Sequence, residues 1–153
     1  MDRKVAGFSL LELLVIIAIL SILMYAGISQ YTKYKADREL TRQANQIADD
    51  LSWIKSQSIS KEPHGIVITL NNYTLFKDLD GSCGFSAGDE IISVVNFIKG
   101  ITQQNSSQTI VFDRKGYPRD NNCALGLSSI TLLNYYNNQK IINISRYGRI
   151  QIQ

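Results

Sequence analysis

The chain has 153 residues, of which 44% are hydrophobic and 19% charged, a composition typical of a folded protein and not of a disordered or low-complexity one. The net charge is only +3, but the last third is distinctly basic: from residue 99 onward Asp113 and Asp120 stand against Lys99, Arg114, Lys115, Arg119, Lys140, Arg146 and Arg149. Only this third would attract a polyanion, although a basic surface facing water explains the same excess.

Residues 8–28 form an almost uninterrupted apolar segment behind a short basic leader. As a helix this segment would span about 31 Å, which matches the hydrocarbon core of a bilayer. It is longer than the apolar region of a secretory signal peptide, and no convincing small-residue cleavage site follows it. We therefore predict a membrane-spanning helix. Glu12 stands near its start, where a charge at membrane depth costs about 3 kcal/mol, so this carboxylate needs an explanation.

Residues 29–62 continue the helix with a different pattern. Apolar or small residues recur at steps of three and four, and this stripe comprises Leu40, Ala44, Ile47, Ala48, Leu51, Ile54 and Ser58. No proline occurs before Pro63. We predict one continuous helix from about Phe8 to about Ser60, whose second half is amphipathic and lies on a folded domain.

Residues 63–153 change to a strand pattern. "GIVITL" and "YTLFK" flank Asn71-Asn72, which predicts a hairpin with a two-residue turn, and "SSITLLNYY" and "KIINISRYGRIQI" flank residues 137–139, which predicts a second. "EIISVVNFI" and "TIVFD" are further β-rich runs, and "GITQQNSSQ" is a polar loop. The predicted fold class is α+β, with a mostly antiparallel sheet packed on the second half of the helix.

Two features of this domain leave alternatives open. Cys83 and Cys123 are too far apart for a CxxC motif, so they form a disulfide if the domain lies outside the cytoplasm, or remain two buried thiols. Asp78, Asp80 and Asp89 occupy positions 1, 3 and 12 of an EF-hand-like loop, but Cys83 stands where that loop needs glycine. An acidic turn between strands is favoured over a calcium site.

Little in the sequence indicates catalysis. His64 is the only histidine, and it precedes a strand, where a structural role is favoured. No nucleophile elbow, phosphate-binding loop or cluster of metal ligands occurs. We predict a protein that is not an enzyme and has no cofactor.

The leader, Gly7, Phe8, a hydroxyl residue and "LLELL" together resemble the type IV prepilin signature of pilins and type II secretion pseudopilins. The resemblance implies cleavage after Gly7 by a prepilin peptidase, methylation of the new amine of Phe8, and a glutamate, Glu12, at the fifth position of the mature chain. It also implies that residues 1–7 are a leader on the cytoplasmic side, which the charges flanking the apolar segment do not settle. A buried carboxylate is tolerated beside a cation, so Glu12 would pair with the Phe8 amine of a neighbouring subunit and set the register of the helices.

The strand order, "TIVFDRKGYP", "ISRYGRIQI" and "GDEII" are similar to GspH/FimT-type minor pilins and pseudopilins. This resemblance implies an inner-membrane protein with residues 63–153 in the periplasm or outside the cell, with other pilins and an assembly platform as partners and lipid around the helix before assembly. Some FimT-like members bind DNA through a C-terminal Gly-Arg-x-Arg element. Gly148 and Arg149 match it, but Gln151 replaces the second arginine. With Lys140 and Arg146 they are the candidate DNA-binding residues, expected to support only weak, salt-sensitive binding.

Overall fold

The computed structural model describes residues 9–153 and contains two compact units, divided between Lys35 and Ala36. A single helix, α1 (Leu10–Ser60), contributes to both. Ser9 caps its start, because its hydroxyl accepts a hydrogen bond from the backbone N–H of Leu11 (3.3 Å) and its carbonyl accepts one from Leu13 (3.2 Å). The predicted helix and its end at Ser60 are confirmed, while Phe8 lies outside the described residues.

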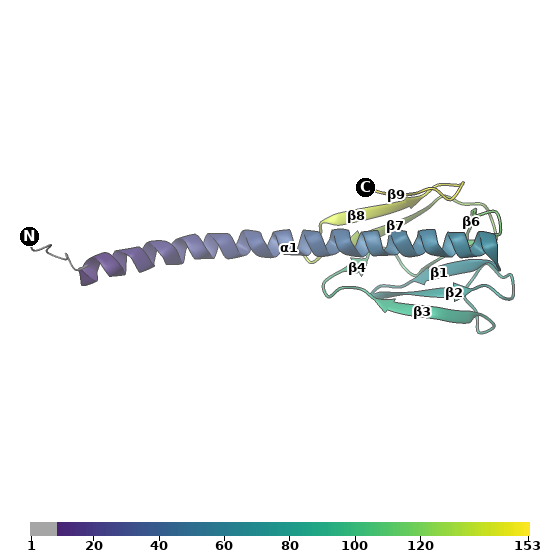
Figure 1. Ribbon diagram of the computed structural model, residues 1–153, viewed down its shortest axis with the longest axis horizontal. Coiled ribbons are helices and arrows are strands. Elements are labelled where there is room, and N and C mark those ends of the chain that lie inside the picture. Colours follow the sequence, from purple (N-terminus) through teal and green to yellow (C-terminus); the bar gives the residue numbers. More distant parts are fainter. Residues whose placement is uncertain (1–8) are drawn as a thin grey trace, which may run out of the picture. The chain divides into compact units, whose positions relative to one another are not determined.

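The second unit is built around the predicted stripe of α1. Within it, Leu40, Ala44, Ile47, Leu51 and Ile54 are all at most 2% exposed. Their steps of four and three residues keep them on one side of the helix, so a single face enters the core. Figure 1 shows strands on either side of this part of α1, and the core residues come from the helix and from two sheets.

Within residues 9–153, nine strands form these two antiparallel sheets, which confirms the α+β class. The first has the order β3-β2-β1-β5-β6 and consists of β1 (His64–Ile68), β2 (Asn72–Lys77), β3 (Glu90–Asn96), β5 (Gln108–Phe112) and β6 (Pro118–Arg119). The second has the order β4-β7-β8-β9 and consists of β4 (Thr102–Gln103), β7 (Ser128–Leu133), β8 (Gln139–Ile144) and β9 (Ile150–Ile152). Alternating strand residues fill the core, Ile66 and Ile68 from the first sheet and Ile142 and Ile144 from the second.

The first hairpin forms where it was predicted, but its turn is displaced by one residue. Ile68 pairs with Tyr73, and Thr69 N–H donates to the Asn72 carbonyl (2.8 Å), so Leu70 and Asn71 form the tip and Asn72 begins β2. The described non-glycine residues with positive φ are Cys83, Cys123 and Asn137, so this turn does not use the left-handed conformation that the Asn-Asn prediction invoked. The Asn72 side chain instead accepts a hydrogen bond from the Thr69 hydroxyl at 2.8 Å.

The segments 100–108 and 139–152 also differ from the prediction. Residues expected to be a polar loop contain β4, where Gln103 is 1% exposed and its N–H donates to Leu70 of the first hairpin (3.0 Å). The expected single C-terminal strand is two strands, β8 and β9, joined by a turn in which Gly148 has a φ of 74°. Gly148 permits this reversal, because residues with a Cβ rarely adopt that conformation.

Behind the first sheet, a second small apolar group lies outside the main core. Phe76 is fully buried, and its ring centroid lies 5.0 Å from that of Phe85, which comes from the acidic loop 78–89. Gly65 provides the space, because a Cβ there would lie 2.5 Å from the Phe76 ring. The acidic loop is therefore packed against the first sheet through Phe85.

Candidate functional site

The described part of the first unit is a stretch of helix whose apolar side chains face outward on every side. Leu10 is 81% exposed, Ile22 72% and Met24 64%, and the most apolar 18-residue window has a mean hydropathy of 2.5. Among the described residues α1 is the one helix long and apolar enough to cross a membrane. Its polar hydroxyl at Ser21 donates to the Ile17 carbonyl (2.7 Å), so that hydroxyl proton is satisfied within the helix.

Glu12 lies in the first turn of α1 and is exposed along with its apolar neighbours. A carboxylate is favoured at this end of a helix, because the unpaired N–H groups there carry partial positive charge. Gly7 and Phe8, the predicted cleavage and methylation positions, lie outside the described residues. The pairing of Glu12 with an amine of another subunit therefore stays a prediction.

The structure joins Cys83 to Cys123 in a disulfide, with the two Cα atoms 5.3 Å apart. This bond connects the acidic loop 78–89 with the turn that follows β6. The sulfur of Cys123 also lies 3.8 Å from the Gly81 carbonyl oxygen. Two segments that are 40 residues apart in sequence are thus held together beside the first sheet.

The carboxylates of Asp78, Asp80 and Asp89 come within 4.8 Å of one another. Each carboxylate already accepts hydrogen bonds within the loop. Asp78 accepts the backbone N–H groups of Ser82 and Cys83, and Asp89 accepts those of Ser86 and Leu79. Asp80 accepts the Ser82 N–H and the Ser86 hydroxyl. Burial raises the pKa of Asp78, whereas the Ser82 and Ser86 side chains lower the pKa of Asp80 to about 2. The loop therefore uses these oxygens to hold its own backbone.

The four candidate DNA-binding residues do not form one cluster. Lys140 is near the start of β8, where it pairs with Leu132, whereas Arg146, Gly148 and Arg149 lie in the turn after the end of that strand. Arg146 and Arg149 are exposed, and Gly148 is buried. Gly148 therefore serves the packing of the turn, and the arginines on either side of it face solvent.

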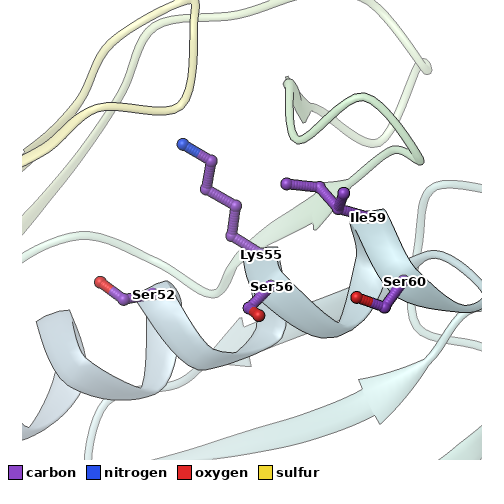
Figure 2. A pocket seen from close by; sticks show the side chains of 5 residues that line it. All are labelled: Ser52, Lys55, Ser56, Ile59 and Ser60. Carbon is purple, nitrogen blue, oxygen red and sulfur yellow. The ribbon is translucent and has the colours of Figure 1, made fainter.

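Gly148 is buried because two turns meet there on the helix. A Cβ on Gly148 would lie 2.2 Å from the carbonyl oxygen of Gly116, which belongs to the turn between β5 and β6. Lys55 of α1 donates its Nζ to the Gly148 carbonyl at 2.7 Å. Figure 2 shows Lys55 extended from the helix, with Ile59 one turn later and Ser52, Ser56 and Ser60 lining the same hollow.

The contact between these two turns brings together basic residues that are about 30 positions apart in the sequence. Arg114 and Lys115 are exposed in the turn that contains Gly116, and Arg146 is exposed beside Gly148. The rings of Tyr117 and Tyr147, one from each turn, have centroids 6.1 Å apart. We call residues 114–117 and 146–149 the two-turn surface. Sequence reasoning missed its first half, because only the Gly116–Gly148 contact reveals that the turns are neighbours.

An ion pair supports the first of these turns. Asp113 accepts hydrogen bonds from the backbone of Lys115 (2.8 Å) and Tyr117 (2.9 Å), and its other oxygen lies 2.8 Å from the Arg119 guanidinium. Burial alone would raise the pKa of Asp113, but the Tyr117 N–H and Arg119 outweigh it and lower the pKa. The negative charge of Asp113, next to the two-turn surface, is thus already balanced by Arg119.

His64 has a structural role. It is 2% exposed, its backbone N–H donates to the Ser58 hydroxyl (2.9 Å), and its Nδ1 lies 2.6 Å from the Glu62 carbonyl oxygen. The ring packs edge-on against Trp53. These contacts fasten the end of α1 to the start of β1.

Comparison with known proteins gives a family motif and a fold. Residues 2–25 match the prokaryotic N-terminal methylation motif. The type IV minor pilin FimU of Pseudomonas aeruginosa is similar in structure, with a TM-score of 0.59 and 15% identity over 78% of this chain and 92% of that one. The minor pseudopilin EpsH of the Vibrio cholerae type 2 secretion system has a TM-score of 0.55 and 12% identity over 75% of this chain and 96% of that one. No curated protein matches the sequence significantly.

The long helix packed on antiparallel sheets is the fold of these pilin structures, and the methylation motif overlaps the apolar start of α1. The chain thus has a pilin-like fold and carries the prokaryotic N-terminal methylation motif.

Proposed function

We propose that the chain is a GspH/FimT-type minor pilin or pseudopilin, a non-catalytic subunit of a type IV pilus or type II secretion filament. The observation that carries this proposal is the methylation motif over residues 2–25, which overlaps an outward-facing apolar helix with a single acid near its start. The similarity of the fold to a minor pilin and a minor pseudopilin supports it.

In this proposal a prepilin peptidase cleaves after Gly7, and the amine of Phe8 is methylated. Residues 8–28 hold the protein in the inner membrane, with the second unit in the periplasm or outside the cell. A disulfide between Cys83 and Cys123 supports that location, because such bonds persist in oxidising compartments. An assembly platform then transfers the helix from lipid into a bundle of pilin helices.

Glu12 acts in that transfer. An isolated carboxylate in an apolar bundle is costly, and a neighbouring subunit's N-terminal amine removes the cost while specifying one axial position. Replacing Glu12 by Ala should leave the protein in the membrane but reduce its recovery in sheared filaments by an order of magnitude or more, since such a pair is worth about 3 kcal/mol or more when broken. Ser21→Ala, a polar-to-apolar change in the same segment, is the matched control. Normal incorporation of the Glu12 variant would refute the pairing.

A second candidate function is DNA binding by the two-turn surface, as in a FimT-like receptor for DNA uptake. The specific observation that favours it is the convergence of Arg114, Lys115, Arg146 and Arg149 on two turns in contact, with Tyr147 73% exposed between them. Cations supply most of the affinity for a phosphate backbone, and an exposed aromatic ring can stack on an unpaired base.

The test is a gel-shift assay with the full chain in detergent at low and high salt. Arg149→Ala should weaken binding several-fold and reduce its salt dependence, because one phosphate contact is lost. Lys99→Ala removes the same charge from an exposed position in another loop and should have little effect. Absence of a shift at every salt concentration would eliminate this candidate and leave the filament proposal intact.

A further inference from the structure

The tip of the hairpin between β7 and β8 carries an aromatic side chain without a role in the core. Tyr135 is 83% exposed, and its ring packs edge-on against that of Tyr136, with centroids 5.7 Å apart. A single exposed tyrosine is common on protein surfaces, but Tyr135 lies in a turn that several side-chain hydrogen bonds hold in place.

The turn is fastened to the helix by side-chain amides. Asn134 and Asn138 both donate their Nδ2 groups to Oδ1 of Asp37, at 2.8 and 2.7 Å. The Oδ1 of Asn134 in turn accepts the backbone N–H groups of Tyr136 (2.9 Å) and Asn138 (3.0 Å). Asn134 is 5% exposed, so its side chain lies inside the unit, and four hydrogen bonds together hold the tip in one conformation.

Asp37 is the second residue of the second unit, which places the hairpin tip at the end of that unit where the chain enters it. Only eight residues, 29–36, separate Asp37 from Ile28, the last residue of the apolar segment. Eight helical residues rise about 12 Å, and even a fully extended chain of that length reaches only about 28 Å. The polar layer of a bilayer is about 5–8 Å thick on each side, so Asp37 lies within about 7 Å of its outer edge if the connection is helical and within about 23 Å if it is extended.

The chemistry of this end suits a lipid headgroup layer. Tyrosine is enriched at membrane interfaces because its ring is apolar and its hydroxyl is wet. Lys33, Lys35 and Arg38 are exposed in the same part of α1, and Asp37 binds the hairpin.

We propose that Tyr135 inserts into the headgroup layer of the membrane, so that the β7–β8 hairpin is a second, peripheral membrane contact of the unassembled protein. This inference rests on the proposed membrane span of residues 8–28. The contact would limit the tilt of the second unit while the subunit waits in the membrane, and it would have to be released when the helix leaves lipid for a filament.

The test uses the full chain, reconstituted into vesicles of phosphatidylethanolamine and phosphatidylglycerol that contain brominated lipids with the bromine at different depths. In a Trp53→Phe background, single tryptophans are introduced by Tyr25→Trp, Tyr135→Trp or Tyr147→Trp. Tyr25, 84% exposed, reports on the span. Tyr147, 73% exposed, is the matched control, because its turn is docked on Lys55, eighteen residues further along α1 than Asp37.

We expect bromines on the acyl chains to quench the Tyr25→Trp variant, bromines nearest the headgroups to quench the Tyr135→Trp variant, and neither to quench the Tyr147→Trp variant. Quenching of Tyr135→Trp no stronger than that of Tyr147→Trp, with Tyr25→Trp quenched, would overturn the hairpin contact and leave the span intact. An unquenched Tyr25→Trp variant would overturn the span and with it the proposed function.

A salt titration separates insertion of the ring from attraction by the surrounding cations. Quenching of the Tyr135→Trp variant that persists at high salt supports insertion, because apolar burial is not screened. Loss of the quenching at high salt would overturn insertion. Asp37→Ala in the Tyr135→Trp background releases the hairpin from the helix and should reduce the quenching, and unchanged quenching would show that the pinned turn is not needed.

Discussion

At the scale of single residues, the positions of several segments depend on glycines that leave space for close contacts and on one aspartate that accepts two hydrogen bonds. Gly148 lets two turns meet on Lys55, Gly65 makes room for the Phe76 ring, and Asp37 holds two asparagine amides at once. None of these residues belongs to an apolar pattern, yet each one determines where a neighbouring segment lies.

Gly148→Ala tests this directly. The alanine would need a left-handed backbone conformation and would place its Cβ 2.2 Å from the Gly116 carbonyl oxygen, so the turns must separate. We expect a loss of about 2 kcal/mol or more in the free energy of unfolding, measured by urea denaturation in detergent. Gly126→Ala is the control, since no atom lies within 4 Å of a Cβ there. Equal stability of the two variants would contradict the docking role.

Asp80 gives a prediction about pH. The hydroxyls of Ser82 and Ser86 and the Ser82 N–H favour its ionised form and lower its pKa to about 2, below the ordinary value for aspartate of about 3.9. The folded state thus binds the proton less readily than the unfolded state, so the stability it contributes is present above pH ~4 and is lost as the pH falls toward 2. Asp80→Asn should flatten the fall in melting temperature over this range. Asp49→Asn, at an exposed position of α1, should leave the fall unchanged.

At the scale of elements, the long helix and the acidic loop are held in place by different kinds of interaction. The second half of α1 is positioned by a continuous stripe of buried side chains, so many weak contacts determine its place. The acidic loop 78–89 has few apolar residues and depends on Phe85, on carboxylates that bind its own backbone, and on the disulfide. Removal of one support should therefore affect the loop far more than the helix.

Replacing both Cys83 and Cys123 by Ser should lower the free energy of unfolding by about 4 kcal/mol, because a bond that closes a 40-residue segment restricts the unfolded chain. The acidic loop should also become the first site of proteolysis. Treatment of the parent protein with a reductant should reproduce the loss, while the double variant should be insensitive to it. A reductant that destabilises both equally would show that the disulfide is not the cause.

At the scale of the whole molecule, one chain combines a helical segment whose apolar side chains are exposed and a unit with its own core. The first needs lipid or other helices, and the second is folded without them. This combination suits a protein that is stored in a membrane and later moved into an assembly.

Mass spectrometry of the protein purified from native membranes should find a chain that begins at Phe8 with a methylated amine. The physical reason is that Glu12 needs a nearby positive charge in an apolar bundle, and cleavage after Gly7 creates one. A chain that retains residues 1–7, or one cut near residue 30, would contradict the proposed processing and the role of Glu12.

The sequence alone determined the features that depend on local order. The end of α1, its buried stripe, both predicted hairpins and the antiparallel strands follow from periodicity and turn residues, which act between neighbours in the chain. Tertiary structure decided the division of the strands into two sheets, the placement of β4, the separation of Lys140 from Arg149, and the meeting of the turns at Gly116 and Gly148. These depend on contacts between residues distant in sequence, where the packing of the whole unit selects among arrangements that local preferences leave equal.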